Sequence, residues 1–273
     1  MVRERDLLKW VADRAPVGDD CAVLECAPWG TLLVTTDSVI DGVHLRWDRE
    51  GPEAFGYKAV ARGMSDVAAM GGEPLWAVIA VCLPKGVTEK QAHGVYRGAE
   101  RAGCALVGGD TSFGPLAYVA ATVFGRAHAK GPVPRSGARP SDGIFVTGPL
   151  GGSYESGRHF RFTPRVAEAK RLMDQVGITA MIDVSDGLST DLLHILEASG
   201  VGCRLEAEAI PINEGATLEG ALADGEDYEL LLTAREGARG CVRIGTITDR
   251  KAVLVFSDGR EEALRARGWE HEG

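Results

Sequence analysis

The segment from residue 129 to residue 142 constrains the fold most, because it divides the chain into two halves of similar size. It reads Ala-Lys-Gly-Pro-Val-Pro-Arg-Ser-Gly-Ala-Arg-Pro-Ser-Asp, and clusters of Pro, Gly and Ser are typical of connections between domains. The chain has 273 residues, which is enough for two domains of ordinary size. We therefore predict an N-terminal domain over residues 1–132 and a C-terminal domain over residues 133–273.

Each half mixes apolar runs typical of buried strands with apolar residues at helical spacing. Thr88 and Gln91 form a capping-box pattern at the start of one predicted helix, and Gly71, Gly103 and Gly177 mark helix ends. The predicted strands cover residues 31–37, 76–83, 105–107, 116–126, 143–147, 181–184, 204–207, 228–233, 243–247 and 253–256, and the predicted helices cover 53–70, 88–103, 163–177 and 189–199. This order is not a simple alternation of strand and helix, so the expected class is α/β with mixed (α+β) sheets.

Charge and composition exclude several classes of partner. The chain has 30 Lys and Arg against 39 Asp and Glu, a net charge of −9, which argues against nucleic acids and anionic membranes as partners. None of the six cysteines forms a C-x-x-C pair, so neither a zinc site nor a disulfide framework is expected. The charged N-terminus lacks an apolar signal core, and the apolar run Leu75–Leu83 is too short to span a bilayer. We expect a cytoplasmic protein.

Aspartates recur at predicted strand ends and beside glycines. A single aspartate of this kind is more often a turn or cap residue, but the set as a whole suits several Mg²⁺ ions, which prefer carboxylate and phosphate oxygens. Spacing alone does not show that these side chains converge. The set comprises Asp19, Asp20, Asp37, Asp66, Asp110, Asp183 and Asp186.

The familiar nucleotide-binding loops are absent from the sequence. Gly108-Gly109-Asp110-Thr111 can bring backbone amides close to a phosphate or can form a tight turn. Gly152 and Gly157 have the spacing of a P-loop, but Arg158-His159 follows in place of Lys and Ser or Thr. Lys58 and Arg126 are interpreted as surface charges.

An ordered series of short motifs resembles the thiamine-monophosphate kinase family, which belongs to the aminoimidazole-ribonucleotide-synthetase-like ATP-binding superfamily. The series extends from residue 18 to residue 269. The motifs are Gly18-Asp-Asp-Cys-Ala22, Thr35-Thr-Asp37, His44, Tyr57-Lys-Ala59, Ser65-Asp66 with Ala69-Met-Gly71, Gly108-Gly-Asp-Thr111, Arg135-Ser-Gly137, Ile182-Asp-Val-Ser-Asp-Gly187 and Gly225-Glu-Asp-Tyr-Glu-Leu230. The chain departs from the family pattern at Gly63, Asp224 and residues 162–165.

The resemblance implies an N-terminal domain that dimerises, with strands of both subunits forming a barrel, and a C-terminal α/β sandwich. It implies that ATP and several Mg²⁺ ions bind at the domain junction, and that the γ-phosphate moves onto thiamine monophosphate to give thiamine diphosphate. The implied metal ligands are Asp20, Asp37, Asp66, Asp110, Asp183 and Asp186, assisted by Thr35 and Thr36. The implied ATP contacts are Gly108, Gly109, Arg135 and Ser185, and the implied thiamine-phosphate contacts are His44, Glu226 and Trp269.

Of these residues, Asp37, Asp110 and Asp186 are the ones we expect to be catalytic. Two alternatives remain: a related ATP-dependent enzyme with a different acceptor, and a catalytically silent nucleotide- or metal-binding module.

Overall fold

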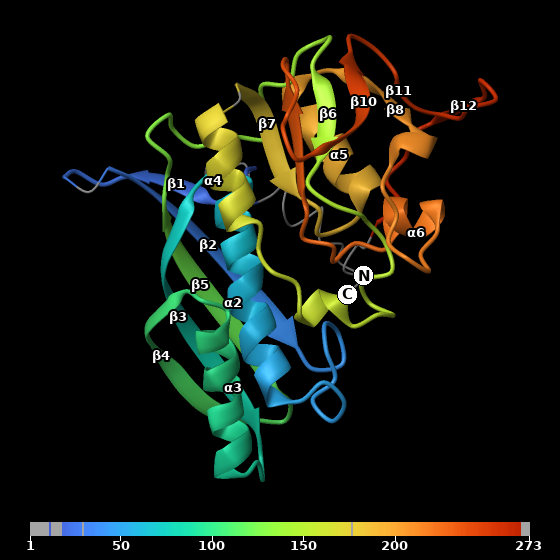
Figure 1. Cartoon of the computed structure of the whole chain (residues 1–273). Helices are drawn as coiled ribbons and strands as arrows, with labels where there is room; N and C mark the ends of the chain where they lie inside the picture. Colours follow the sequence, from blue (N-terminus) through green and yellow to red (C-terminus); the bar gives the residue numbers. More distant parts are fainter. Residues whose placement is uncertain (1–10, 12–17, 29, 176, 269–273) are drawn as a thin grey trace.

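The computed structural model describes residue 11 and residues 18–28, 30–175 and 177–268. The strands of this part form two sheets that come from successive stretches of the chain (Figure 1). The five strands of the first sheet lie between residues 22 and 126, and the seven strands of the second lie between residues 143 and 263. A mixed α/β architecture with two sheets was the expected class.

The first sheet has the order β1-β2-β5-β3-β4, and its pairings are antiparallel except for the parallel pair β3–β4. Side chains on alternate residues of β2, β3 and β5, such as Leu33, Ile79 and Val119, are fully or almost fully buried, as expected for a sheet with one covered face. Two helices, α2 and α3, cover this face (Figure 1). The elements are β1 (Ala22–Glu25), β2 (Thr31–Ile40), α2 (Pro52–Ala69), β3 (Glu73–Pro84), α3 (Glu89–Arg101), β4 (Ala105–Gly114) and β5 (Tyr118–Arg126).

The opposite face of the first sheet is left uncovered by the residues that the structure describes. Trp76 and Ala80 of β3 point to this face and are exposed, because they alternate with the buried Ala77, Ile79 and Val81. Trp76 is 45% exposed, which is unusual for a tryptophan in the middle of a sheet. The sheet therefore presents a surface with exposed apolar side chains that no described part of the chain covers.

The helices α2 and α3 cross in very close contact. A Cβ atom added to Gly98 of α3 would lie 2.0 Å from the carbonyl oxygen of Glu53 on α2, and one added to Gly56 would lie 1.8 Å from the carbonyl oxygen of Val95. Glycine is unfavourable inside a helix by about 1 kcal/mol relative to alanine. Its presence at both crossing points follows from the need for backbone-to-backbone contact.

The second sheet has the order β12-β11-β8-β10-β6-β9-β7. Its pairings are antiparallel except for the parallel pair β11–β8. Its elements are β6 (Gly143–Val146), η1 (Arg158–Phe160), α4 (Val166–Gln175), β7 (Ile178–Asp183), α5 (Leu188–Ser199), β8 (Gly202–Glu206), η2 (Ala207–Ala209), α6 (Leu218–Ala223), β9 (Leu230–Ala234), β10 (Val242–Thr248), β11 (Ala252–Val255) and β12 (Glu261–Ala263).

Helices cover both faces of the central strands of this sheet. Ile144 and Val146 of β6 pack with residues of α5 such as Leu192 in one apolar cluster. Phe145, between them, belongs to a different cluster together with Leu172 of α4. This alternation explains why all four residues of β6 are buried.

Helix α2 joins the two halves. Its last turn, Ala68 and Ala69, packs in the same cluster as Phe145 and Leu172 of the second half. Nearer its start, Tyr57 packs with Phe162 and Tyr228. Two apolar clusters therefore contain residues from both halves. Shared clusters do not separate the halves into two independent cores, so the predicted domain boundary between residues 132 and 133 stays a prediction.

The structure extends and corrects several predicted elements. The strand predicted over residues 105–107 continues to Gly114, and α4 begins at Val166 rather than at Thr163. The sequence interpretation missed β1, β12 and α6. Strands β1 and β12 are edge strands, whose weak alternation carries little signal. Among the described residues, no helix is long and apolar enough to cross a membrane.

Replacing Gly98 by alanine tests the helix crossing. We expect Gly98→Ala to lower the free energy of unfolding by about 1–3 kcal/mol, because the new methyl group meets the backbone of α2 and forces the helices apart. Gly94→Ala is the matched control on the same helix, since its Cβ would meet the side chain of Pro52 at 2.9 Å rather than a backbone atom. Urea unfolding measures both. Equal effects of the two substitutions would contradict the close crossing.

Candidate active site at the junction of the two halves

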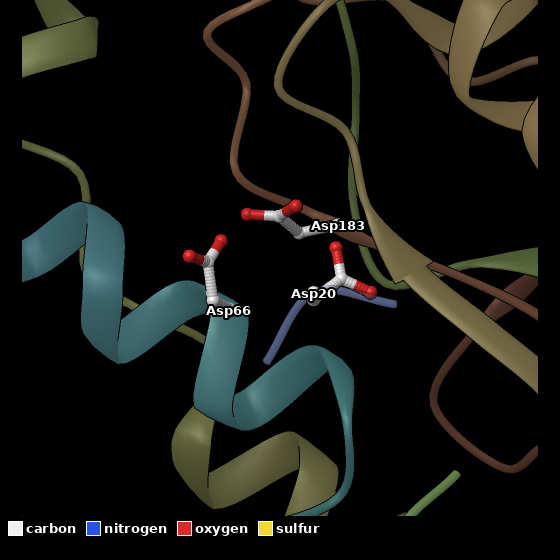
Figure 2. A group of neighbouring side chains, drawn as sticks. All are labelled: Asp20, Asp66 and Asp183. Carbon is white, nitrogen blue, oxygen red and sulfur yellow. The ribbon is translucent and has the colours of Figure 1, made fainter. Parts of the chain in front are cut away.

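Three aspartates from distant parts of the sequence converge where the two halves meet. Carboxylate oxygens of Asp20, Asp66 and Asp183 all lie within 4.8 Å of one another. Figure 2 shows the three side chains pointing toward a common space, with Asp66 on α2. Asp183 is the last residue of β7, and Asp20 lies just before β1. The resemblance implied that all three are metal ligands, and the fold brings these three together.

Short hydrogen bonds orient two of these carboxylates. The hydroxyl of Thr35 on β2 donates to Oδ2 of Asp66 at 2.5 Å. The hydroxyl of Ser65, next to Asp66 on α2, donates to Oδ2 of Asp183 at 2.5 Å. Each bond crosses between two elements, so the carboxylates have fixed positions before any ligand binds.

Asp37 on β2 lies beside the three aspartates. Its Oδ1 is 3.0 Å from a guanidinium nitrogen of Arg62 on α2. Among the described residues, its Oδ2 is buried and has no hydrogen-bond partner. A buried carboxylate oxygen without a partner is rare in proteins, and it is a candidate ligand atom.

Arg135 connects the segment between the halves to the first part of the chain. Its guanidinium is 2.9 Å from Oδ1 of Asp20, and its backbone amide donates to Asp19 at 2.7 Å. The resemblance implied that Arg135 contacts ATP. The structure places it at the edge of the aspartate cluster, and its contact with ATP stays a prediction.

Burial and mutual repulsion shift the acidity of the cluster. Burial raises the pKa of Asp183 to about 7, and the nearby charge of Asp20 adds to this effect. Burial raises the pKa of Asp66 well above its ordinary value, with further contributions from Asp37 and Asp183. Burial also raises the pKa of Asp20, although Arg135 opposes the shift. These carboxylates therefore resist being charged together unless a cation joins them.

The donor set fits hard divalent cations. Carboxylate oxygens are the ligands that Mg²⁺ and Ca²⁺ prefer, and a bound cation removes the repulsion that raises these pKa values. The buried, unpartnered Oδ2 of Asp37 adds a further oxygen next to the three converging carboxylates. Four carboxylates are thus suited to hold Mg²⁺, those of Asp20, Asp37, Asp66 and Asp183. Thr35 supports this set through its hydrogen bond to Asp66.

A cavity of about 470 Å³ opens beside the cluster. Four residues that the resemblance assigned to ligands line it: His44, Ser185, Asp186 and Glu226. The imidazole Nδ1 of His44 accepts a hydrogen bond from the backbone amide of Ile40 at 3.1 Å. The cavity thus brings these four residues together although they lie up to 182 positions apart in the sequence.

Lys58 was interpreted as a surface charge, and this interpretation is wrong. Its side chain is fully buried on α2. The ammonium lies 2.6 Å from Oε2 of Glu226, 2.9 Å from Nδ1 of His159 and 3.4 Å from the backbone oxygen of His44. Three donors therefore meet three acceptors, which satisfies a buried ammonium fully. Lys58 thereby fixes the wall of the cavity that carries Glu226 and His44.

These contacts also set the protonation of the cavity wall. Burial lowers the pKa of Lys58 to about 8, although Glu226 opposes the shift. Burial and the charge of Lys58 lower the pKa of His159 to about 4, so His159 is neutral at pH 7 and can accept from Lys58. Burial favours the neutral acid form of Glu226, but Lys58 and Arg62 outweigh it and lower the pKa of Glu226. Glu226 is therefore ionised where it lines the cavity, with its Oε2 paired to the ammonium of Lys58.

The spacing of charged residues on α2 could have identified Lys58 and Arg62 as site residues from the sequence. Lys58, Arg62 and Asp66 follow one another at intervals of four, which places them on one face of a helix. Their side chains all reach the junction of the halves. A charged stripe on an otherwise apolar helix was the signal that the sequence interpretation overlooked.

A buried aspartate holds the loop that follows Asp183. Oδ2 of Asp191 on α5 accepts hydrogen bonds from the backbone amides of Ser185, Asp186 and Gly187, each at 3.1 Å. These three bonds fix the loop that carries two cavity residues, Ser185 and Asp186.

The family departures lie around the cavity. Asp224 lines the cavity and accepts a hydrogen bond from the backbone amide of Gly152 at 2.9 Å. The ring of Phe162 stacks on Tyr228 with centroids 3.9 Å apart. Gly63 faces the first sheet, since a Cβ there would lie 2.7 Å from a methyl group of Val123. Of these three, only Asp224 lines the cavity.

The structure does not bring Thr36 and Asp110 to the cluster within one chain. The hydroxyl of Thr36 accepts from Thr122 on the uncovered face of the first sheet. Asp110 pairs with the exposed Ala80, whereas its neighbour Thr111 bonds to Tyr96 on the helix side. Gly108 and Gly109 lie on the same edge strand, β4. The roles of these residues stay predictions, and Trp269 lies outside the described residues.

A second hollow of about 520 Å³ runs along α5 and includes His194 and Glu197. Its described lining contains none of the aspartates discussed above and no residue of the first half. Size alone therefore does not identify the site, and the convergence of charged groups does.

Removing one charge from the cluster should stabilise the metal-free protein. Between about pH 4 and pH 7 folded Asp183 keeps a proton that the unfolded chain has lost, so the free energy of unfolding falls as pH rises. At pH 8, in EDTA, we expect Asp183→Asn to raise the free energy of unfolding by on the order of 1–4 kcal/mol, because each pKa unit corresponds to about 1.4 kcal/mol.

Urea unfolding at pH 4 and pH 8 measures this effect. The gain should be present at pH 8 and small at pH 4, where Asp183 is protonated in the folded state. Asp258→Asn is the control, because Asp258 is exposed and lies far from the cluster in the sequence. A loss of stability in Asp183→Asn at pH 8 would contradict the raised pKa.

Comparison with known proteins agrees with the resemblance. The family described as AIR synthase related protein matches through its N-terminal domain at residues 18–127 and through its C-terminal domain at residues 147–258. The thiamine-monophosphate kinase of Salmonella typhimurium is 36% identical, with 93% of this chain and 91% of the relative covered. That of Rhodopirellula baltica is 40% identical, with 79% and 74% covered.

Comparison with solved structures also finds thiamine-monophosphate kinases. A structure described as AaThiL complexed with AMPPCP and TMP is 31% identical, has a TM-score of 0.86 and covers 98% of this chain and 96% of its own. The thiamine monophosphate kinase of Aquifex aeolicus is 30% identical, with a TM-score of 0.80 and coverage of 94% and 97%. The hydrogenase maturation protein HypE of Escherichia coli, 19% identical with a TM-score of 0.71 and coverage of 95% of each chain, shares the fold. The chain therefore belongs to the thiamine-monophosphate kinase family within the AIR-synthase-related proteins.

Proposed function

We propose that this chain transfers the γ-phosphate of ATP directly onto thiamine monophosphate and forms thiamine diphosphate. The observation that carries the proposal is the aspartate cluster at the junction of the halves, next to a cavity lined by Glu226 and Asp186. The family supports it, since a relative of 31% identity is described in complex with AMPPCP and TMP.

The chemistry suits the site. The acceptor is itself a phosphate and is anionic at neutral pH, so it needs no strong general base. The barrier arises from bringing two anionic phosphates into line, and catalysis depends on positioning and electrostatic shielding. When bound, Mg²⁺ ions would neutralise the charge that the phosphates share. A cluster of carboxylates beside an acceptor cavity meets both requirements.

Asp20, Asp37, Asp66, Asp183 and Asp186 would hold the ions. Thr35 and Ser65 support this set because they orient the carboxylates of Asp66 and Asp183. Asp37 supplies the unpartnered oxygen. Asp186 lines the acceptor cavity three residues beyond Asp183, so a short stretch of chain links the cluster to the cavity.

Arg135 and Ser185 are our candidates for contacts to the triphosphate. Arg135 already ion-pairs with Asp20 at the edge of the cluster, and its planar guanidinium can bind phosphate oxygens in a bidentate manner. Ser185 lies in the loop that Asp191 holds rigid, so its hydroxyl is available in a fixed place.

His44 and Glu226 are our candidates for the acceptor. The thiazolium ring of thiamine carries a positive charge, and the ionised Glu226 lines the cavity. An aromatic face also attracts such a ring, and we retain Trp269 as a predicted contact of this kind.

We propose that the protein is a homodimer whose subunits meet through the uncovered face of the first sheet, with strands of both subunits forming a barrel. The exposed Trp76 and Ala80 support this, because such apolar faces are normally covered. A dimer would also place Thr36 and Asp110 at the subunit interface. There they would bind metal ions, next to Gly108 and Gly109, which would contact ATP. We further propose a cytoplasmic location, with neither nucleic acid nor membrane as a partner.

A chromatographic assay tests the activity. We expect thiamine diphosphate from ATP, Mg²⁺ and thiamine monophosphate, and no such product from thiamine. Asp37→Asn and Asp110→Asn should each lower kcat by at least about 100-fold, which corresponds to about 2.7 kcal/mol of transition-state stabilisation. Asp258→Asn, at the surface, should keep the wild-type rate.

The outcomes separate the alternatives. ATP binding without any diphosphate formation would favour a silent binding module. ATP turnover with a different acceptor, and none with thiamine monophosphate, would favour another enzyme of the superfamily. Either result would overturn the proposed function.

Sedimentation velocity tests the dimer. The wild-type protein should sediment at twice the chain mass of 28.9 kDa. Trp76→Arg should sediment as a monomer, because it replaces an exposed apolar side chain of this face by a charged one and desolvating that charge opposes association. Val242→Arg is the matched control, since Val242 is an exposed apolar residue of the second sheet. A monomeric wild-type protein would refute the dimer.

A further inference from the structure

The acceptor cavity has a strong internal polarity. Its lining includes four carboxylate side chains, those of Glu155, Asp186, Asp224 and Glu226, and among the described lining residues Arg62 is the single Lys or Arg. Lys58 does not line the cavity but is buried against Glu226, with its ammonium 2.6 Å from Oε2 of that carboxylate, so Glu155, Asp186 and Asp224 carry the rest of the negative charge. A phosphorylated cation has two ends of opposite charge. A cavity with several anionic groups and one guanidinium can bind such a molecule in one orientation, because the reverse orientation places like charges together.

Arg62 is fixed in position by β2. One guanidinium nitrogen donates to the backbone oxygen of Ser38 at 2.9 Å, and the other lies 3.0 Å from Oδ1 of Asp37. The side chain is 19% exposed, so it is largely enclosed. A guanidinium held from two sides has lost most of its conformational freedom before a ligand arrives, which lowers the entropic cost of binding.

Arg62 retains hydrogen-bonding capacity. A guanidinium carries five N–H donors, and the contacts to Ser38 and Asp37 use two of them. The structure shows no further hydrogen bond of Arg62 among the residues it describes. Phosphate oxygens are the ligands that best match such a planar fork.

The position of Arg62 also places its ligand next to the aspartate cluster. Asp37 receives the guanidinium on Oδ1, and its buried Oδ2 has no partner among the described residues. A phosphate bound by Arg62 would therefore lie next to Asp37, which is one of the proposed ion-binding carboxylates. An acceptor phosphate must lie close to these carboxylates if it is to meet a γ-phosphate.

We propose that Arg62 binds the phosphate of the acceptor and thereby orients it with its cationic ring toward Glu226 and its phosphate toward the aspartate cluster. This inference rests on the proposed function. It assigns the specificity for a phosphorylated over an unphosphorylated acceptor to one residue of α2. The exposed ring of Tyr154, which lines the same cavity and is 50% exposed, then lies in the wall available to the acceptor's ring.

Isothermal titration calorimetry with thiamine monophosphate and with thiamine tests the proposal. We expect Arg62→Met to weaken thiamine monophosphate binding by about 10- to 100-fold, the usual contribution of a hydrogen bond to a charged group. Thiamine binding should change by less than about 3-fold, because thiamine has no phosphate to lose. Arg62→Lys should recover part of the affinity. Arg97→Met is the control, since Arg97 ion-pairs with Glu53 at the surface.

Steady-state kinetics separate this role from two others. If Arg62 binds the acceptor phosphate, Arg62→Met raises the KM for thiamine monophosphate and leaves the KM for ATP and the Mg²⁺ requirement near their wild-type values. If Arg62 instead binds the γ-phosphate of ATP, the KM for ATP rises. If it only holds Asp37 in place, the Mg²⁺ requirement rises. Either of the last two patterns, alone, overturns the proposal.

Failure of this proposal can be told apart from failure of the proposed function. A wild-type protein that forms thiamine diphosphate, combined with an Arg62→Met variant of unchanged KM and affinity, overturns the role of Arg62 alone. A wild-type protein that neither binds thiamine monophosphate nor forms the diphosphate overturns both.

Discussion

The burial of α2 between the two halves is the constraint on which the rest of the structure depends. One side of the helix packs on the first sheet and on α3, and its last turn packs into the second half. Because it is enclosed on several sides, its polar residues cannot escape to solvent. Lys58, Ser65 and Asp66 must therefore find partners from other elements, and those partners are Glu226, Asp183 and Thr35. The site is built from these obligatory pairings.

The same enclosure lowers the stability of the folded protein at the site. Buried carboxylates that face one another repel, and desolvation adds to the penalty. Uncompensated arrangements of this kind persist in proteins chiefly where function requires them. The contrast with Lys58 is instructive, because its three acceptors compensate its charge within the chain. Among the described residues, the cations that pair with these aspartates are Arg135 and Arg62, and both lie at the edges of the cluster. A bound cation would complete the compensation of their charge.

Local pattern was sufficient for most of the fold, and for the part of the site that lies in short motifs. The capping box at Thr88 and the apolar runs of β2, β3 and β5 carry their own signal. The convergence of Asp20, Asp66 and Asp183 could be expected from the resemblance but not from spacing, because it depends on how two halves dock. Lys58 was misplaced because burial of a charged residue is set by tertiary partners. Which face of a strand Asp110 occupies depends on the register with β3, and the sequence does not reveal that register.

The raised pKa values of Asp66 and Asp183 have a calorimetric consequence. At neutral pH the metal-free cluster retains protons, because the pKa of Asp183 is about 7 and that of Asp66 lies well above its ordinary value. A cation that enters must displace those protons, since the ligating form is the carboxylate. Ion uptake is thus an acid-releasing reaction, and its measured heat will include the ionisation enthalpy of whichever buffer receives the protons.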